Sequence, residues 1–330
     1  MQRTIIVVAM LVAGCAATPQ MTPQPAEATP LPHGSGALAS PGTPSPASTP
    51  ARLAGRILFL RHVDDELTFY SIRPDGSELK TLEPTDPALR RMSPDGSMFV
   101  EMFLEDGHFA KIFASDGSLI RTLDLPDPAL GLACLTWSPD GARLACEGWD
   151  ATNPGEDLKP DRVGLYTVQV DGGDLRQLTS PADHRHDQEP QYSDDGLQIR
   201  YVHSTDEDGE LGELWAINVD GTANQRLISD PVGWTTDLSP DGRWLATKLN
   251  GELAIYDASD WSMPPMRHHL QDAYAWQFSW SPDGSHVAFM ASVVALADNG
   301  IGTIAADGTG FQILPTGSDP GLIDLIGWLP

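Results

Sequence analysis

The sequence predicts an all-β fold, a six-bladed β-propeller with four antiparallel strands in each blade. The first observation is a turn tetrapeptide, Ser-Pro-Asp-Gly, that begins at residues 93, 138, 239 and 281, with a Ser-Asp-Asp-Gly variant at residue 193. Successive turns are 45, 55, 46 and 42 residues apart, and a period of about 40 to 50 residues is typical of propeller blades. The second observation is another turn, usually Asp-Gly, later in each unit.

Each repeat unit is predicted to contain strand A, the first turn, strand B, a loop, strand C, the second turn and strand D. In the first turn, proline presets φ at the second position, aspartate tolerates the next position, and glycine adopts φ > 0, which closes a three-residue hairpin loop with a bulge. An apolar strand B is expected after it, and the third residue after each glycine is apolar: Phe99, Leu144, Ile199, Leu245 and Val287. The second turns, each between β-rich runs, lie at residues 73–76, 115–117, 170–172, 219–221, 257–259 and 306–308.

The chain has six second turns but five first turns, and this mismatch predicts how the ring closes. Residues 56–60 have the pattern of a strand B with no strand A before it. Residues 327–330, with Trp328, have the pattern of the end of a strand A with nothing after it, as in residues 279–282. We therefore expect the C-terminal strand to complete the first blade, which leaves no open sheet end.

Two cysteines lie on either side of the Ser-Pro-Asp-Gly turn at residues 138–141. Cys134 is four residues before Ser138, and Cys146 is five residues after Gly141. With a bulged turn, this spacing places the two cysteines opposite each other across the hairpin. An exported protein would permit a disulfide bond there; the alternative is a pair of small buried hydrophobic residues.

The N-terminal residues are predicted to lie outside the propeller. Arg3 precedes an apolar run, residues 4–13, that is too short to span a bilayer as a mature helix. The run ends in Val12-Ala13-Gly14-Cys15, which resembles a bacterial lipobox and implies cleavage before Cys15 and lipidation of that residue. The alternative is an ordinary secretory signal with an incidental cysteine. On the strength of the lipobox-like segment, we assign residues 1–14 to a lipoprotein signal peptide.

Residues 15–52 are expected to form a lipidated cysteine and a disordered tether, and residues 53–330 the propeller. The tether is rich in Pro, Thr, Ser and Ala, and it holds nine of the 28 prolines of the chain. We expect an exported, membrane-anchored protein of the bacterial cell envelope, periplasmic or extracellular. It would be attached by its lipid to the periplasmic side of the outer membrane or to the outer surface of the cytoplasmic membrane.

The repeats resemble those of the TolB C-terminal propeller and related WD40-like propellers. The resemblance is carried by the Trp-Ser-Pro-Asp-Gly segments at Trp137 and Trp280 and by the later Asp-Gly turns, and it covers roughly residues 53–330. In the other units Met92, Tyr192 and Leu238 stand in place of the tryptophan. The resemblance implies the propeller fold for this range.

Composition limits the kinds of partner. The chain carries 46 acidic and 20 basic residues, a formal net charge of −26. Nucleic acid is disfavoured, because phosphates require Lys and Arg. The charge favours solubility, or a cationic or basic partner.

Acidic residues recur in the two sets of loops, D to A and B to C, that emerge on the face opposite the Ser-Pro-Asp-Gly turns. This loop face is expected to be acidic, and topology would focus its field at the channel mouth. It would serve as a docking surface or as a Ca²⁺ site; the alternative is that these loops are acidic only because the whole protein is. The candidate binding residues are Asp86, Asp127, Asp150, Asp157, Asp206, Asp208, Asp230 and Asp319.

The best local cluster for metal ligands lies in one D-to-A connection. His184, His186, Asp187 and Glu189 provide two imidazoles and two carboxylates within six residues. Propeller lyases that act on uronic-acid sugars, which belong to the wider resemblance, use His-rich metal sites. The alternative is a solvated loop. The two longest B-to-C loops, residues 148–162 and 203–212, flank this cluster, so a specific site is expected near it.

The predicted function is a non-catalytic envelope lipoprotein whose propeller presents an acidic loop face to a protein, peptide or glycan. Common nucleophile, zinc-protease and phosphate-loop motifs are absent from the sequence, and the ring closes at the C-terminus, so we expect no catalytic domain and no cofactor. The alternatives are a metal-dependent lyase or hydrolase acting on acidic sugars, for which Arg162 and Arg185 would bind the substrate, and a Ca²⁺-binding sensor propeller. We expect a monomer that contacts the membrane through its lipid alone.

Overall fold

The computed structural model describes residues within Leu53–Pro330. The exceptions are residues 64–65, 84–85, 87–88, 103–107, 126, 128, 151–161, 182–185, 206–210, 229, 234, 271–272, 294–297 and 317–321. Cys15 and the predicted signal peptide and tether therefore lie outside the described residues. Among the residues described, no helix has the length and apolarity that a membrane crossing requires.

The repeated turn is held by its own side chains. In residues 138–141, the backbone N–H of Gly141 donates to the carbonyl of Ser138 at 2.8 Å, and Gly141 has a φ of 69°. Asp140 Oδ1 accepts bonds from Ser138 Oγ at 2.6 Å and from the N–H of Ala142 at 3.0 Å. The other four turns repeat this arrangement. Aspartate thus caps the turn, while glycine supplies the left-handed backbone.

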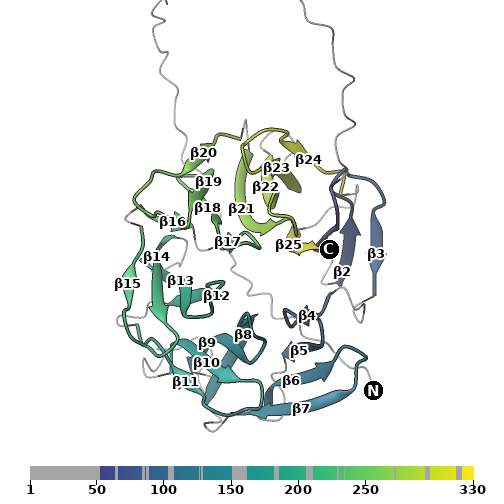
Figure 1. The fold of residues 1–330 in the computed structure, drawn as a ribbon. Helices are drawn as coiled ribbons and strands as arrows, with labels where there is room; N and C mark the ends of the chain where they lie inside the picture. The colour runs from purple at the N-terminus through teal and green to yellow at the C-terminus, as the bar shows by residue number, and fades with distance from the viewer. Residues whose placement is uncertain are drawn as a thin grey trace, which may run out of the picture. The chain divides into compact units, whose positions relative to one another are not determined.

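These turns join strands into six antiparallel sheets arranged in a ring (Figure 1). The strands of blade 1, from the innermost outward, are β25 (Leu322–Leu329), β1 (Arg56–Val63), β2 (Glu66–Ile72) and β3 (Lys80–Leu82). Those of blade 2 are β4 (Arg91–Met92), β5 (Met98–Met102), β6 (His108–Ala114) and β7 (Leu119–Asp124). Those of blade 3 are β8 (Leu130–Trp137), β9 (Arg143–Asp150), β10 (Gly164–Gln169) and β11 (Arg176–Gln177).

The second half of the ring has the same order. Blade 4 contains β12 (Asp187–Tyr192), β13 (Gln198–Ser204), β14 (Leu211–Asn218) and β15 (Gln225–Arg226), and β16 (Val232–Gly233) adds to β14. Blade 5 contains β17 (Thr236–Leu238), β18 (Trp244–Leu249), β19 (Glu252–Asp257) and β20 (Met266–His268). Blade 6 contains β21 (Ala273–Trp280), β22 (His286–Val293), β23 (Asp298–Ala305) and β24 (Gln312–Ile313). The predicted fold class is confirmed.

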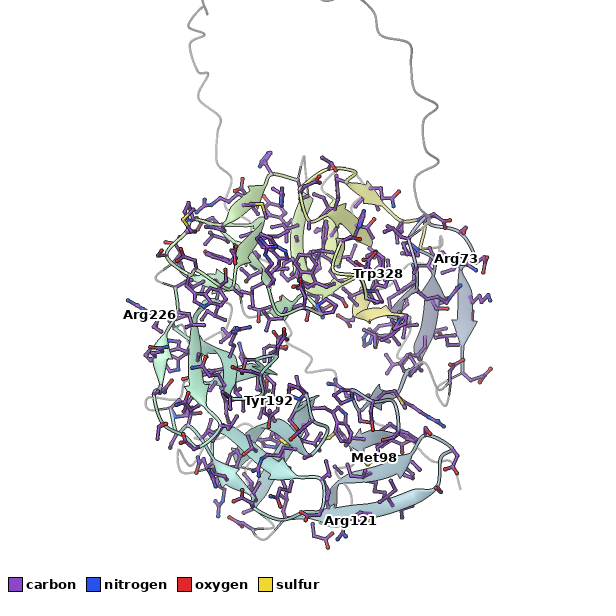
Figure 2. The ribbon with its side chains drawn as sticks, in the orientation of Figure 1. Arg73, Met98, Arg121, Tyr192, Arg226 and Trp328 are labelled. Carbon is purple, nitrogen blue, oxygen red and sulfur yellow. A yellow bond between two sulfur atoms is a disulfide. The ribbon has the colours of Figure 1, made fainter. Side chains whose placement is uncertain are left out.

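The ring closes as the sequence predicts. Strand β25 pairs with β1, with Ile57 opposite Trp328. Trp328, which is labelled in Figure 2, is 4% exposed; its backbone N–H donates to Ser279 Oγ of blade 6 at 2.8 Å, and its Nε1 donates to the Ala54 carbonyl at 3.1 Å. Strand β25 therefore joins the two ends of the described propeller and binds blade 6 to blade 1.

Among the described residues, clusters of hydrophobic side chains fill five of the seams between neighbouring blades. Buried clusters connect blade 2 to 3, 3 to 4, 4 to 5, 5 to 6, and 6 to 1. The five apolar residues that follow the turns, Phe99, Leu144, Ile199, Leu245 and Val287, are all at most 1% exposed. Among the described residues, none of these clusters connects blade 1 to blade 2. The described hydrophobic core therefore consists of separate clusters, each between two neighbouring blades, and not of one central cluster.

Cys134 and Cys146 are Cα partners in the β8–β9 hairpin, and a disulfide bond joins them. Both residues are at most 1% exposed and lie in the hydrophobic cluster between blades 2 and 3. The bond therefore crosslinks the two inner strands of blade 3 inside its core.

Candidate binding site at the seam between blades 3 and 4

Four of the eight predicted acidic residues lie among the described residues, and four lie outside them. Asp157, Asp206, Asp208 and Asp319 lie outside the described residues. Asp230 is exposed in the connection between blades 4 and 5. Asp86 is half-buried, and its backbone forms turn hydrogen bonds with Glu83 and Leu89.

The remaining two carboxylates share one guanidinium. Arg162 Nε donates to Asp127 Oδ2 at 2.9 Å, and Arg162 Nη1 is 3.4 Å from Asp150 Oδ2. The Asp150 side chain is 1% exposed, at the end of β9. The Ala129 N–H, together with Arg162, holds the pKa of Asp127 below its usual range. Arg162 therefore compensates acidic charge on this part of the loop face and does not stand free for an anionic substrate.

The described members of the predicted metal set have different partners. His184 lies outside the described residues, as does Arg185. The backbone N–H of His186 donates to Ser204 Oγ, Asp187 contacts the ring of His203, and the N–H of Glu189 donates to Glu147 Oε1. Burial lowers the pKa of His186, and Asp187 partly offsets this effect. Within the part of the chain that the structure describes, no group of three or more His, Cys, Asp or Glu residues is arranged to hold a metal ion.

A pocket of about 250 Å³ lies at the seam between blades 3 and 4. The connection from β11 to β12 forms one side, and β12, β13 and β14 and the residue before β15 form the other. Its lining consists of Leu178, Thr179, Ser180, Pro181, Asp187, Tyr201, His203, Trp215 and Asn224. We refer to it as the Trp215 pocket.

Its polar side chains are held in place by hydrogen bonds. His203 Nδ1 is 2.6 Å from Asp187 Oδ1, and the Asp187 side chain is 3% exposed. The Tyr201 hydroxyl donates to Asn224 Oδ1 at 2.8 Å. Burial, more than any other cause, raises the pKa of Tyr201 far above its ordinary value, so this hydroxyl stays protonated.

The indole of Trp215 is fixed in a similar way. Its Nε1 donates to Glu213 Oε2 at 3.0 Å, and Glu213 Oε1 is 2.7 Å from Arg226 Nη1. The rings of His203 and Trp215 meet edge to face, with their centroids 5.9 Å apart. The pocket therefore has a positioned aromatic wall beside a positioned imidazole.

The sequence interpretation identified Asp187 but missed His203, Trp215, Tyr201 and Asn224 as parts of one site. His203 and Trp215 lie on strands that run together in blade 4, with Tyr201 opposite Trp215 in the β13–β14 register. The alternation of strand residues would have placed His203 and Tyr201 on one face. It could not have identified the connection from blade 3 as the other wall.

A second polar cluster, which the sequence interpretation also missed, joins the inner strands of blades 3 and 4. Glu189 has a φ of 54°, at an irregularity in the register of β12. Burial and then the neighbouring charge of Glu189 raise the pKa of Glu147, and burial raises the pKa of Glu189, while Arg91 acts to lower both. Burial also raises the pKa of Asp237 to about 7, and Glu189 contributes to this shift.

The fold and this geometry define a six-bladed propeller with a polar pocket between two blades. No protein-family model and no curated protein sequence matches the chain. Solved structures show similar folds. A protein assigned as TolB from Agrobacterium tumefaciens matches at 17% identity with a TM-score of 0.51, over 78% of this chain and 88% of that chain.

Two further structures are similar at comparable levels. TolB from Acinetobacter baumannii matches at 19% identity with a TM-score of 0.56, over 85% of this chain and 68% of that chain. An oligogalacturonate lyase in complex with manganese matches at 16% identity with a TM-score of 0.53, over 78% of this chain and 73% of that chain. These matches show that the chain has a TolB-like six-bladed propeller fold.

Proposed function

We propose that this protein is a non-catalytic envelope lipoprotein that recognises a protein, peptide or glycan through its loop face. Cys15 would carry the lipid, residues 16–52 would form the tether, and the propeller would present the binding surface. The observation that carries the recognition role is the Trp215 pocket, because its lining side chains are already fixed by hydrogen bonds before any ligand binds. Preorganised side chains lower the entropic cost of binding.

The fold supports the same role. A propeller is a rigid ring that positions loops, and binding residues tend to lie on loops held by such a scaffold. The fold is shared with TolB structures and with a lyase, so fold alone does not select between recognition and catalysis. The pocket, with its aromatic wall and few polar groups, is the kind of surface that supports recognition.

We retain the acidic loop face in this proposal, but with fewer uncompensated carboxylates than the sequence alone suggests. Arg162 compensates Asp127 and Asp150, so the charge of the face would come from its other carboxylates, including Asp86 and Asp230. An electrostatic partner would then bind less tightly as salt rises. Binding that is insensitive to salt would assign recognition to the pocket instead of the charges.

A binding experiment on full-length protein tests the recognition role. Envelope protein and envelope polysaccharide fractions would be tested separately for direct binding to the purified protein in detergent. We expect one fraction to bind, and we expect His203→Ala combined with Trp215→Ala to abolish that binding. His269→Ala is the matched control, because His269 is an exposed histidine on blade 5 that contacts Glu252 at 3.1 Å. Equal binding by the pocket variant and the control would contradict the proposal.

The anchor is tested independently of the ligand. Cells fed a radiolabelled fatty acid should label the wild-type protein and not the Cys15→Ser variant, and the variant should leave the membrane fraction. Unlabelled wild-type protein would contradict the lipoprotein assignment and leave the recognition role to be judged by the binding experiment.

Metal-dependent catalysis on acidic sugars is the alternative, supported by the fold shared with an oligogalacturonate lyase in complex with manganese. It predicts a stoichiometric transition metal that is lost in a His184→Ala, His186→Ala variant, and manganese-dependent cleavage of oligogalacturonate. A Ca²⁺ sensor would instead show a melting temperature that rises in added Ca²⁺. Either result would displace the recognition role.

A further inference from the structure

We propose that the Trp215 pocket binds one uncharged pyranose ring, a sugar residue of a neutral glycan. This inference rests on the proposed recognition function and names the class of ligand for it. Three features of the pocket favour this ligand: its size, its aromatic wall and the hydrogen-bonding side chains that line it.

The size of the pocket favours a single small ring. Its volume of about 250 Å³ is below the roughly 300 to 1,000 Å³ of pockets that enclose drug-sized molecules. A folded peptide or an extended chain would not fit inside it. One ring of a glycan can enter while the rest of the chain stays outside.

The aromatic wall suits the C–H face of a sugar. Trp215 is held by its bond to Glu213, and Glu213 is held by Arg226. The indole N–H is therefore already satisfied, and what the side chain offers a ligand is ring surface. A pyranose carries C–H groups on its faces and hydroxyl groups around its edge, so it can pack against the indole and still present polar groups to the other walls.

The polar walls match hydroxyl groups. The ring nitrogen Nδ1 of His203 faces the carboxylate of Asp187, so in the neutral imidazole Nδ1 carries the proton and Nε2 accepts a hydrogen bond. The Oδ1 of Asn224 already accepts the Tyr201 hydroxyl, which leaves the Nδ2 amide to donate. Among the described residues, neither His203 Nε2 nor Asn224 Nδ2 has a hydrogen-bond partner.

A pocket lined by an acceptor, a donor group and an aromatic ring fits a ligand whose groups both donate and accept. A hydroxyl does both, whereas a carboxylate or phosphate accepts only and would leave His203 Nε2 without a donor. An ammonium donates only and would make no bond to the Asn224 amide. The pocket therefore favours a neutral polyhydroxylated ring over an acidic or a basic group.

Calorimetry and tryptophan fluorescence on the full-length protein test this inference. The probes are the methyl pyranosides of glucose, galactose, mannose and N-acetylglucosamine, with methyl glucuronide and a lysine tripeptide as charged comparators. We expect at least one neutral glycoside to bind saturably. Asn224→Asp should weaken it about tenfold or more, because aspartate keeps the acceptor for Tyr201 and loses the donor amide.

Further variants keep the test decisive. His203→Phe removes the acceptor and Trp215→Ala removes the packing surface, so each should weaken the same glycoside by at least about tenfold. Trp261→Phe, at a half-buried tryptophan on blade 5, and His269→Ala should leave it unchanged. If Trp215→Ala fails to fold, Asn224→Asp and His203→Phe still decide the outcome.

The outcomes separate this inference from the broader proposal. Binding of the charged comparators alone, or glycoside binding that survives all three pocket variants, would overturn the sugar assignment. If no glycoside binds while the His203→Ala, Trp215→Ala protein still loses its envelope fraction, the sugar assignment fails and the recognition role stands. If neither glycosides nor envelope fractions bind, both fail.

Discussion

At the residue scale, the serine and aspartate of each first turn act as a pair. Ser138 Oγ donates to Asp140, and it also accepts the backbone N–H of Arg143 at 2.9 Å. The equivalent serine hydroxyl of the first of these turns is the leading cause that lowers the pKa of Asp95 to about 2. The serines are nearly buried; Ser138 is 4% exposed. The repeated serine and aspartate therefore bind backbone N–H groups that the turn would otherwise leave without partners.

Ser138→Ala should destabilise the protein by about 1–3 kcal/mol, because it leaves the buried N–H of Arg143 without its acceptor. The measurement is the free energy of unfolding in urea. Ser118→Ala is the control, because Ser118 Oγ bonds Asp116 in an exposed turn; its cost should be smaller. Equal costs for the two variants would show that burial of the serine is not what matters.

The raised pKa values of Glu147 and Glu189, at the seam between blades 3 and 4, predict that the stability of the protein depends on pH. A carboxyl whose pKa is raised in the folded state binds its proton more tightly there than in the unfolded chain. The stabilisation that such a carboxyl contributes is therefore complete below the ordinary carboxyl pKa of about 4.3. It is lost as the pH rises through the raised pKa of the folded state. The groups that face one another are Glu147, Glu189, Arg91 and, beyond Glu189, Asp237.

Glu147→Gln should flatten that fall. Glutamine keeps an oxygen acceptor for the N–H of Glu189 but does not ionise. Unfolding free energies at pH 5 and pH 8 should differ less in the variant than in the wild type, and the variant should be the more stable protein at pH 8. An unchanged difference between the two pH values would show that Glu147 does not titrate in this range.

At the element scale, the β8–β9 hairpin is the unit whose register the sequence defines best. Seven Cα partners pair its strands, and Cys134 lies opposite Cys146 just before an irregularity in β8. Similar irregularities lie at Glu189 in β12 and at Gln277 in β21, both with positive φ. Gln277 Oε1 accepts the N–H of Leu325 from the next blade. At such an irregularity, a side chain or a backbone N–H can therefore bond the neighbouring blade.

Removing the disulfide should cost about 3 kcal/mol, since the two cysteines enclose a short loop with a sequence separation of 12 residues. The Cys134→Ala, Cys146→Ala variant should melt at a lower temperature, and a reducing agent should lower the melting temperature of the wild type but not of the variant. The bond would be contradicted if reductant left the melting temperature of the wild type unchanged and if both thiols of the unreduced, unfolded protein reacted with an alkylating agent.

At the scale of the whole molecule, stability depends on how the ring is closed. Strand β25 comes from the end of the chain and β1 from the start of the propeller, and their pairing is what makes the last strand part of the first blade. Trp328 packs in the cluster between blades 6 and 1, and its backbone N–H donates to Ser279 Oγ across that seam.

Trp328→Ala should lower the free energy of unfolding by about 3–5 kcal/mol, the cost of removing a large buried side chain. Trp328→Phe should cost less, because it keeps most of the packing and loses the bond from Nε1 to Ala54. Urea unfolding of both variants checks this order. A loss in Trp328→Phe as large as in Trp328→Ala would assign the effect to the hydrogen bond.

The seam between blades 1 and 2 is predicted to be the weakest. Among the described residues no buried cluster crosses it, and the inner strand of blade 2, β4, consists of two exposed residues, Arg91 and Met92. Hydrogen exchange should therefore be faster in β4 and β5 than in β21 and β22. Equal protection of the two sets would contradict this ranking.

The sequence by itself determined the fold of residues 53–330, including six blades, the closing strand and the register that places Cys134 opposite Cys146. The reason is that each Ser-x-Asp-Gly turn is a local structure whose hydrogen bonds span at most five residues, so its spacing and register can be counted along the chain. Strand alternation then assigns the buried residues that follow the turns.

Only the tertiary structure decided the sites, because they form between segments that are far apart along the chain. Arg162 meets Asp127 from 35 residues away, and Glu189 meets Glu147 from 42 residues away. The Trp215 pocket likewise needs the connection from blade 3 against the strands of blade 4. The rotation between neighbouring blades, which no local pattern records, sets which side chains meet.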